Sequence, residues 1–373
     1  MASNTANNVD PMNPFWSLGA AEEDEGFCLA ASLVTASITF GVFKAVKDLK
    51  VFEVIKKSGP NAPLTAAEIV AKLPTENPGA AAAALGRMLD LLVGQSVLTA
   101  TFVTLPDGTG QRCYGLAPAC KFLTPDEDGI SLAPKVSMYK AMIESSLFLK
   151  DAVVEGVEPF TKAHGMSYYE YFGEKAERRE EFHEGMASHS ILIMRKILRT
   201  YKGFEGISML VDVGGGNGAT LSMILSQYPN IKGINFDQLP VVANAPPYPG
   251  VEHVGGNIFV NIPKGDAIFL KWICHCFKDE ACIMILKNCY DALPEDHGKV
   301  IICEGLRPDP QEITTSVEAN SILQLDMVMM ATTGGKERTE KEFEALAFAA
   351  GFQGFQVACS AYNAKVMELL KNN

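Results

Sequence analysis

The pattern of apolar and polar positions changes near residue 210. Beyond that point, short apolar runs typical of buried strands alternate with helical patterns, which indicates an open, doubly wound α/β sheet. In such a sheet, ligands bind at the carboxyl ends of the strands. The predicted strands cover residues 210–213, 232–236, 251–255, 267–271, 299–304, 354–358 and 365–369.

The N-terminal part has a different pattern, which predicts helices followed by a hairpin. Helical spacing covers residues 27–54, and the capping box Thr65-x-x-Glu68 starts a second helix. A third helix runs through Leu85 and Leu92, and residues 97–116 alternate as a hairpin that turns at 106–108. This is the element order of a winged helix. The predicted wing carries little positive charge, which favours a dimerisation or packing module over DNA binding.

These patterns divide the chain into three parts. We expect a flexible polar tail over residues 1–25, a winged-helix-like dimerisation domain over 26–125, and an α/β domain over 126–373. Long helices are expected at about 136–154 and 182–198 of the α/β domain.

The first strand of the predicted sheet runs into a glycine-rich turn. Asp212 and Val213 are followed by Gly214-Gly-Gly-Asn-Gly218, and glycines allow a sharp turn and a close approach of a ligand. The next strand ends at Asp237, about 20 residues on, the usual place of a ribose-hydroxyl acceptor. The order differs from the G-x-G-x-x-G of dinucleotide sites, and Asp212 would repel a pyrophosphate. The turn therefore favours a cationic nucleoside, S-adenosylmethionine, over NAD.

Composition narrows the classes further. The chain has 373 residues, 47% hydrophobic content and a net charge of −12, which fits a globular protein and argues against nucleic acid as a partner. Nine cysteines form no C-x-x-C pair, and we find no secretory leader and no apolar run of the ~18 residues that span a bilayer. We therefore expect a soluble, cytoplasmic protein without membrane contact. No motif for a metal site is present.

Candidate acid–base chemistry lies at the carboxyl edge of the predicted sheet. His275 follows the fourth predicted strand, Glu304 ends the next one, and Glu337 lies in a later tight loop. Histidine exchanges protons near neutral pH, and carboxylates can orient and stabilise an imidazolium. Structural alternatives remain open: His275 could be a buried structural histidine, Glu304 a helix cap or solvated group, and Glu337 a partner of Arg338 or Lys341.

Several segments together resemble one family over nearly the whole chain, the plant type I small-molecule O-methyltransferases of the caffeic acid O-methyltransferase group. The matching segments are 210–218, 233–237, 248–256, 271–275, 334–339 and 350–355. The resemblance implies a Rossmann-like class I methyltransferase domain and a homodimer formed through the winged-helix region. It also implies S-adenosyl-L-methionine as donor, S-adenosyl-L-homocysteine as product, a small aromatic hydroxyl as acceptor and no metal.

The same resemblance assigns site residues. His275 is the implied base, which removes the proton of a phenol. Glu304 and Glu337 flank it. The implied cofactor-binding positions are Ser190, Gly214, Asp237, Asn257, Ile258 and Lys271. The implied acceptor pocket consists of Ser137, Phe172, Phe182, Met186, Cys276 and Met329.

Some positions depart from the family pattern. Cys276 stands where the family commonly has Asp, and a thiol is a poor acceptor for a neighbouring catechol hydroxyl. Asn257-Ile258 stands where Asp-Met is common, and Ser137 where Asn is frequent. We expect cofactor binding to persist and the acceptor to differ from a standard monolignol precursor. An N-methyltransferase on the same scaffold, a catalytically weak dimer partner that binds cofactor, and an NAD-linked oxidoreductase are the alternatives.

Overall fold

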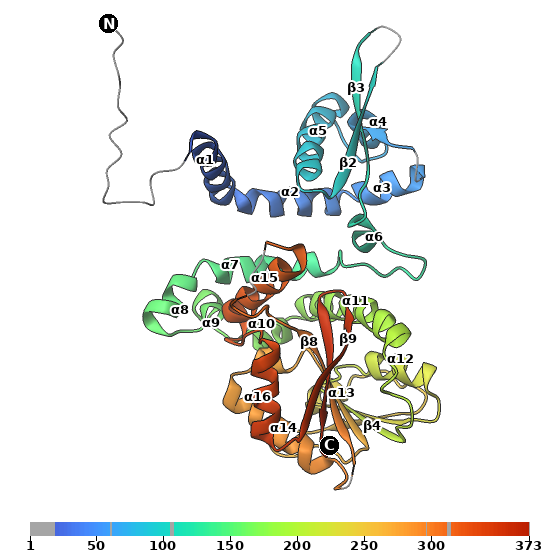
Figure 1. The fold of residues 1–373 in the computed structure, drawn as a ribbon. Coiled ribbons are helices and arrows are strands. Elements are labelled where there is room, and N and C mark those ends of the chain that lie inside the picture. Colours follow the sequence, from blue (N-terminus) through green and yellow to red (C-terminus); the bar gives the residue numbers. More distant parts are fainter. Residues whose placement is uncertain (1–18, 60–61, 105–107, 296, 312–314, 373) are drawn as a thin grey trace, which may run out of the picture. The chain divides into compact units, whose positions relative to one another are not determined.

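The computed structural model describes residues 19–59, 62–104, 108–295, 297–311 and 315–372 (Figure 1). Contacts within the chain divide it into two compact units, Met1–Asp126 and Glu127–Asn373. Most of the tail expected over residues 1–25 lies outside the described residues. From Ala20 onward the expectation was wrong, because α1 (Ala20–Val34) begins there. The Glu22 carboxylate accepts a hydrogen bond from the Gly19 N–H, which favours this helix start.

The N-terminal unit contains helices packed with a small antiparallel sheet in the order β1-β3-β2. The single helix expected over 27–54 is divided at Thr35 and at Lys50, which has a left-handed φ of 55°. The capping box at Thr65 is confirmed. The elements are α1, α2 (Ala36–Asp48), α3 (Val51–Ser58), β1 (Leu64–Thr65), α4 (Ala66–Val70), α5 (Pro78–Gly94), β2 (Leu98–Thr104), β3 (Gly110–Leu116) and α6 (Cys120–Leu123). The hairpin is therefore confirmed, although residues 105–107 of its turn lie outside the described part.

The second unit is built on a seven-stranded sheet in the order β6-β5-β4-β7-β8-β10-β9. Every predicted strand is present: β4 (Met209–Val213), β5 (Lys232–Asp237), β6 (Val251–Gly255), β7 (Ala267–Lys271), β8 (Lys299–Gly305), β9 (Gly354–Ala361) and β10 (Ala364–Leu370). Strands β4 to β8 pair in parallel, whereas β10 is antiparallel to both neighbours. The reversal follows from the tight turn between β9 and β10, where Tyr362 has a φ of 58°.

Helices cover both faces of this sheet (Figure 1), so its strands are almost continuously apolar. Val211 packs in the same buried cluster as residues of α14 (Asp279–Ala292) and α16 (Glu340–Ala350). Leu210, which points to the other face, packs with residues of α11 (Ala176–Thr200) and α12 (Ala219–Gln227). A short helix, α13 (Leu239–Val242), follows β5.

Further helices form a layer that carries aromatic side chains. They are α7 (Lys135–Ser146), α8 (Leu149–Glu155), α9 (Pro159–His164), α10 (Tyr168–Glu174) and α15 (Val317–Thr332). The single helix expected over 136–154 is two helices. The hydroxyls of Ser145 and Ser146 donate to the carbonyls of Met142 and Ile143, and such bonds compete with the helical ladder just before the break.

Among the described residues, no single helix is long and apolar enough to cross a bilayer. The bent pair Ala21–Val34 and Ala36–Asp48 would meet the requirement only by length and composition.

Candidate active site

The glycine turn after β4 requires glycine at several positions. Gly214, Gly216 and Gly218 have φ values of 70°, 60° and 84°, in the left-handed region that other residues rarely adopt. A Cβ on Gly215 would lie 2.6 Å from Oδ2 of Asp212, so the backbone closes tightly over that carboxylate. The turn therefore presents bare backbone at the carboxyl edge of the sheet.

Asp237 is joined to this turn. Its Oδ2 accepts a hydrogen bond of 2.8 Å from the Gly216 N–H, and its Oδ1 accepts one of 2.7 Å from the Gln238 N–H. Burial raises the pKa of Asp237, and these backbone hydrogen bonds oppose the rise. The sequence placed Asp237 and Gly214 at one edge, and the structure brings them together.

Charged groups from distant segments also meet near the turn. Lys271, the last residue of β7, donates a hydrogen bond of 2.7 Å from Nζ to Oγ of Ser190 on α11. Burial lowers the pKa of Lys271. Asp212 is 1% exposed, and its Oδ2 has no hydrogen-bond partner. Burial raises the pKa of Asp212 to about 7. An unpaired buried carboxylate is costly, so this site suits a ligand that carries a cationic group.

Asn257 and Ile258 follow β6 at the same edge, since Gly255 pairs with Asp237 in the sheet. The Oδ1 of Asn257 accepts a hydrogen bond of 2.9 Å from the Phe259 N–H. The acceptor oxygen expected to face an adenine amine is thus engaged in a local turn. Ile258 packs against the main core, and its carbonyl accepts from Nδ2 of Asn288.

His275 lies in the short 3₁₀ helix η2 (Cys274–Cys276) that follows β7. Its Nδ1 is 2.8 Å from Oε1 of Glu337 and 3.8 Å from Oε2 of Glu304. Because a carboxylate can only accept, the close contact favours a proton on Nδ1 and leaves Nε2 free to take one. This geometry brings together the three residues that the sequence singled out.

The two carboxylates contact different parts of the turn. Oε1 of Glu304 accepts from the backbone N–H groups of Ile273, at 2.9 Å, and Cys274, at 2.7 Å. Glu304 therefore holds the turn that carries the histidine, and Glu337 makes the close contact with the ring. Burial raises the pKa of Glu304 to about 7, and the neighbouring His275 opposes that rise.

Burial and the neighbouring groups shift the pKa of His275 in opposite directions. Burial disfavours the imidazolium, but Cys276, Glu304 and Glu337 outweigh it, and the pKa of His275 lies well above its usual value. A proton on this ring is thus stabilised strongly. Such an environment suits a group that must accept a proton and hold it during a reaction.

Glu337 pairs with neither Arg338 nor Lys341, the two structural partners considered for it. Arg338 is fully buried and donates to Asp279 and to the carbonyls of Cys274 and Phe277. Lys341 donates to Asp309. Arg338 therefore fixes the 3₁₀ turn, a contribution that the sequence pattern did not reveal.

The sequence analysis did not identify two further residues that lie around His275 and Glu337. Asp326 on α15 accepts a hydrogen bond of 2.8 Å from the Glu337 N–H and so positions that residue. Trp272 has a left-handed φ of 57°, and its ring lies 5.3 Å from that of His275 and 5.5 Å from that of His189. Backbone in this region is strained and often marks a functional site. Neither feature has a signal in a single sequence.

The residues expected to form the acceptor pocket fall into two groups. Phe172, Phe182 and Met186 belong to one apolar cluster, in which the rings of Phe172 and Phe182 are 5.2 Å apart. Ser137 and Met329 are half-buried on α7 and α15, two helices that contact each other. Neither residue belongs to the apolar cluster itself; Met138 on α7 and Val328 on α15 do.

Cys276 is half-buried next to His275. Its Sγ accepts a hydrogen bond of 3.2 Å from the hydroxyl of Tyr169 on α10. This contact joins α10 to the turn that carries His275.

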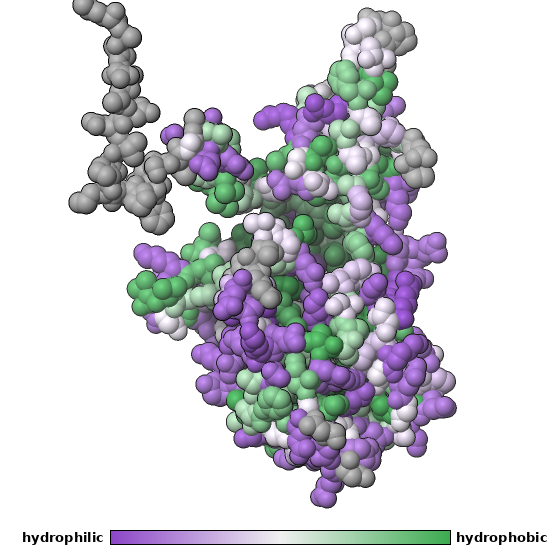
Figure 2. Space-filling view, viewed as in Figure 1, coloured by the Kyte–Doolittle hydropathy of each residue, from purple (hydrophilic) through white to green (hydrophobic). Residues whose placement is uncertain are grey.

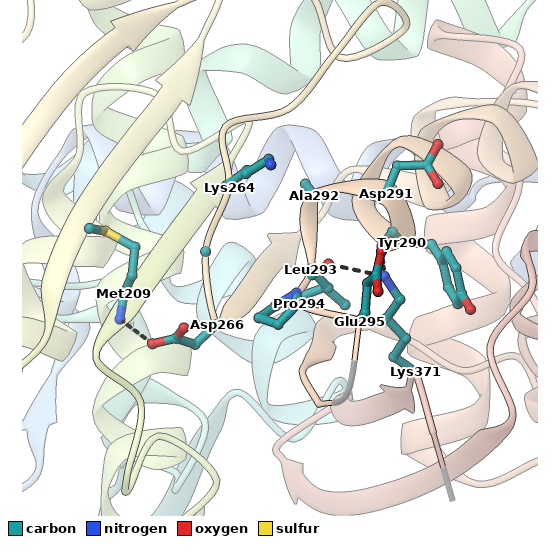
Figure 3. A pocket seen from close by; sticks show the side chains of 11 residues that line it. Met209, Lys264, Asp266, Tyr290, Asp291, Ala292, Leu293, Pro294, Glu295 and Lys371 are labelled. Atoms are coloured by element: carbon teal, nitrogen blue, oxygen red, sulfur yellow. Dashed lines mark hydrogen bonds between the residues drawn. The ribbon is translucent and has the colours of Figure 1, made fainter.

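A separate cavity lies at the opposite, amino edge of the sheet (Figure 3). Asp266 accepts from the N–H groups of Ser208 and Met209, and Lys371 donates to the carbonyls of Tyr290 and Leu293. These polar groups tie the ends of strands and helices together. The polar groups that line this cavity are therefore explained by their contacts within the fold.

Known protein families match both units of the chain. A family model for the O-methyltransferase domain matches residues 147–353, and one for the O-methyltransferase dimerisation domain matches residues 31–126. O-methyltransferase 1 of Lophophora williamsii is 55% identical over 94% of this chain and 96% of its own. Caffeic acid 3-O-methyltransferase of Catharanthus roseus is 52% identical over 96% of this chain and 99% of its own.

Solved structures share the fold at lower identity. CalO1, a methyltransferase in calicheamicin biosynthesis in its SAH-bound form, has a TM-score of 0.77 at 24% identity over 94% of this chain and 99% of its own. Human N-acetylserotonin methyltransferase in complex with SAM has a TM-score of 0.73 at 21% identity over 95% of this chain and 100% of its own. The expected α/β methyltransferase fold with an N-terminal dimerisation domain is confirmed, and the chain belongs to the O-methyltransferase family.

Proposed function

We propose that the protein transfers a methyl group from S-adenosyl-L-methionine to a phenolic hydroxyl of a small plant aromatic metabolite, a phenylpropanoid, flavonoid or related compound. His275 is the general base. The observation that carries this proposal is the buried imidazole whose Nδ1 contacts Glu337 at 2.8 Å, on the sheet edge that also carries the glycine turn.

The residues around that turn fit the donor. Asp212 offers an unpaired buried carboxylate for an ammonium group, and Asp237 can accept from ribose hydroxyls. Lys271 and Ser190 together can bind a carboxylate. When bound, the donor supplies an electrophilic methyl group on a sulfonium, and S-adenosyl-L-homocysteine is the product. Asn257 and Ile258 would border the adenine.

The base is needed because a phenol has a pKa of roughly 10 and is mostly protonated at neutral pH. Nε2 of His275 takes the phenol proton as the oxygen attacks the methyl group. Glu337 then stabilises the imidazolium through Nδ1. This route uses side chains alone and needs no metal Lewis acid. The pocket residues hold the ring in register, which supplies a large part of the acceleration.

We also propose that the active form is a homodimer. The N-terminal unit matches an O-methyltransferase dimerisation domain. Apolar side chains lie exposed on α1 and α2, visible as green patches in Figure 2, and a soluble monomer rarely exposes so many together. They are Phe27, Leu29, Leu33, Val34 and Ile38, each more than 60% exposed. All nine cysteines are free, which fits the proposed cytoplasmic location.

The decisive experiment combines an acceptor panel with one substitution. Labelled S-adenosylmethionine and a set of phenols and amines are incubated with the protein, and products are identified by mass spectrometry. His275→Gln should abolish O-methylation and retain binding of S-adenosylhomocysteine, whereas His183→Gln, at an exposed position on α11, should have little effect. Near-normal turnover in His275→Gln would refute the base. Methylated nitrogen in the products would indicate an N-methyltransferase.

Two observations favour a second candidate, a catalytically weak dimer partner that binds cofactor. The Oδ1 of Asn257 is engaged with the Phe259 N–H, and Cys276 replaces an acceptor beside the base. Both changes weaken contacts that a fast enzyme would use. Binding of S-adenosylhomocysteine without turnover on any acceptor would support this candidate.

A further inference from the structure

We propose that His275, Glu304 and Glu337 form a binding site for a divalent transition metal ion of the zinc class, and that the bound ion inhibits methyl transfer. The inhibitory role rests on the proposed function, in which His275 is the general base. The ion is a reversible ligand of this site and not a cofactor of the reaction.

The three side chains lie at separations that suit such an ion. One ligand atom of each residue lies within 4.8 Å of the ligand atoms of the other two. Nδ1 of His275 is 2.8 Å from Oε1 of Glu337 and 3.8 Å from Oε2 of Glu304. Ligand atoms at about 2.0–2.1 Å from a tetrahedral zinc ion lie about 3.4 Å from one another, between these two values. The ion therefore fits among the three residues after small shifts of their side chains.

The fold holds each carboxylate with one oxygen left for a ligand. Oε1 of Glu304 accepts from the N–H groups of Ile273 and Cys274, whereas its Oε2 has no hydrogen-bond partner within the described residues. Oε1 of Glu337 contacts His275, and its Oε2 likewise has no hydrogen-bond partner there. Both carboxylates are buried. Buried carboxylate oxygens without a hydrogen bond are costly, so an ion that they can coordinate is favoured.

The charges of the group also favour a dication. Burial and the negative charge of Glu337 both raise the pKa of Glu304, so the two carboxylates repel each other. Together with a neutral imidazole they carry two negative charges, which one dication neutralises. The Nδ1 proton of His275 leaves to solvent when the ion binds, because that nitrogen must give its lone pair to the metal.

The ligand set selects the kind of ion. An imidazole nitrogen with two carboxylate oxygens suits zinc and similar transition metal ions, which bind with few ligands. Calcium takes about six to eight oxygen ligands, and magnesium keeps several waters in an octahedral shell. The three side chains are buried, and His275 is the most exposed of them at 7%, which leaves little room for such shells. We therefore expect zinc to bind in preference to magnesium or calcium.

A bound ion prevents His275 from acting as the base. The metal on Nδ1 disfavours a proton on Nε2, because the ring would then carry a positive charge next to a dication. The ion also takes the Glu337 contact that stabilises the imidazolium in the proposed reaction. Zinc and the phenol proton thus compete for one imidazole, and methyl transfer stops while the ion is bound.

Zinc binding is measured first, without turnover. Chelator-buffered zinc chloride is titrated into the protein and into His275→Gln, Glu304→Gln and Glu337→Gln. The matched control is the double variant His183→Gln with Glu184→Gln, which removes an exposed histidine and an exposed carboxylate from α11. We expect the zinc affinity to fall at least about tenfold in each ligand variant and to stay within about threefold in the control. Magnesium chloride and calcium chloride should not displace the zinc.

Two further measurements do not depend on how each variant folds. Cobalt chloride serves as a spectroscopic probe of the unsubstituted protein, and a site of low coordination number should give visible absorption bands that zinc removes. Zinc should also inhibit methyl transfer, and a chelator should restore it. Binding of S-adenosylhomocysteine should be unchanged by zinc, because the ion acts on the base and not on the donor site.

The contrary results are equally definite. An unchanged zinc affinity in all three ligand variants would overturn the inference, and so would a rate of methyl transfer that rises when zinc is added. Inhibition without binding at these residues would place the ion elsewhere, for example at the free thiols, and would also overturn it. If zinc binds through the three residues but no acceptor is methylated, the proposed function fails and the ion site stands.

Discussion

At the scale of single residues, the proposed site contains two buried carboxylates with different contacts. Glu337 contacts the imidazole, whereas Glu304 binds the backbone of the turn that presents it. The sequence could place both at one sheet edge because each follows a recognisable strand or loop. It could not tell which one reaches Nδ1, because that depends on the path of the turn and on the left-handed backbone of Trp272.

Substitution of each carboxylate by its amide separates the two roles. Glu337→Gln removes the charge next to the imidazolium, so kcat should fall about 100-fold or more. Glu304→Gln keeps an oxygen for the backbone N–H groups, so kcat should fall about tenfold or less. Steady-state kinetics with saturating donor measures both. Equal losses would show that the carboxylates act as one unit.

The pH profile tests the environment of His275, the proposed base. A base works only when neutral, so kcat/KM should rise with pH as the imidazolium loses its proton. Because the pKa of His275 is raised, the midpoint should lie above the ordinary value of 6.5. Cys276→Ala removes one of the groups that raise it, and the midpoint should move to lower pH. Cys359→Ala, on β9, is the control, and an upward shift in Cys276→Ala would contradict this account.

At the scale of elements, the sequence predicts strands better than helix ends. Every strand of the large sheet was expected, because parallel strands buried on both faces are continuous apolar runs. The helix breaks at Thr35, at Lys50 and after Ser146 were not predicted, because the helical periodicity of the sequence continues across them. The antiparallel order of β10 is likewise set by a tight turn that carries no Gly or Pro.

The 3₁₀ turn η2 is held by Arg338, and its removal should loosen the element. Arg338→Met leaves the carbonyls of Cys274 and Phe277 without this donor. Unpaired buried groups of this kind destabilise by about 1–3 kcal/mol each, so the free energy of unfolding should fall by about 3 kcal/mol. Lys341→Met, at a side chain that is 81% exposed, should change the free energy of unfolding by less than about 0.5 kcal/mol. Urea denaturation compares them, and similar stabilities would contradict the assigned role.

At the scale of the whole molecule, the proposed active site and the cavity of Figure 3 lie at opposite edges of the sheet. The glycine turn, His275 and Glu304 lie at the carboxyl ends of the parallel strands, and the cavity of Figure 3 lies at their amino ends. The sequence predicted the ligand site at the carboxyl edge, because ligands bind there in such sheets, but it did not predict the cavity at the amino edge. Association between copies is harder to predict from one chain, since exposed apolar positions acquire meaning only once the fold shows which are uncovered.

The exposed face of α1 and α2 allows a direct test of the dimer. Phe27 and Leu33 are 75% and 68% exposed, and burial of such side chains provides the main driving force for association. Phe27→Glu combined with Leu33→Glu should shift the protein from dimer to monomer in light scattering at micromolar concentration, because charge in an apolar interface is costly. Val317→Glu, 87% exposed at the start of α15, is the matched control and should remain dimeric. A dimer that survives the double substitution would move the interface away from these helices, while the active-site assignment would be unaffected.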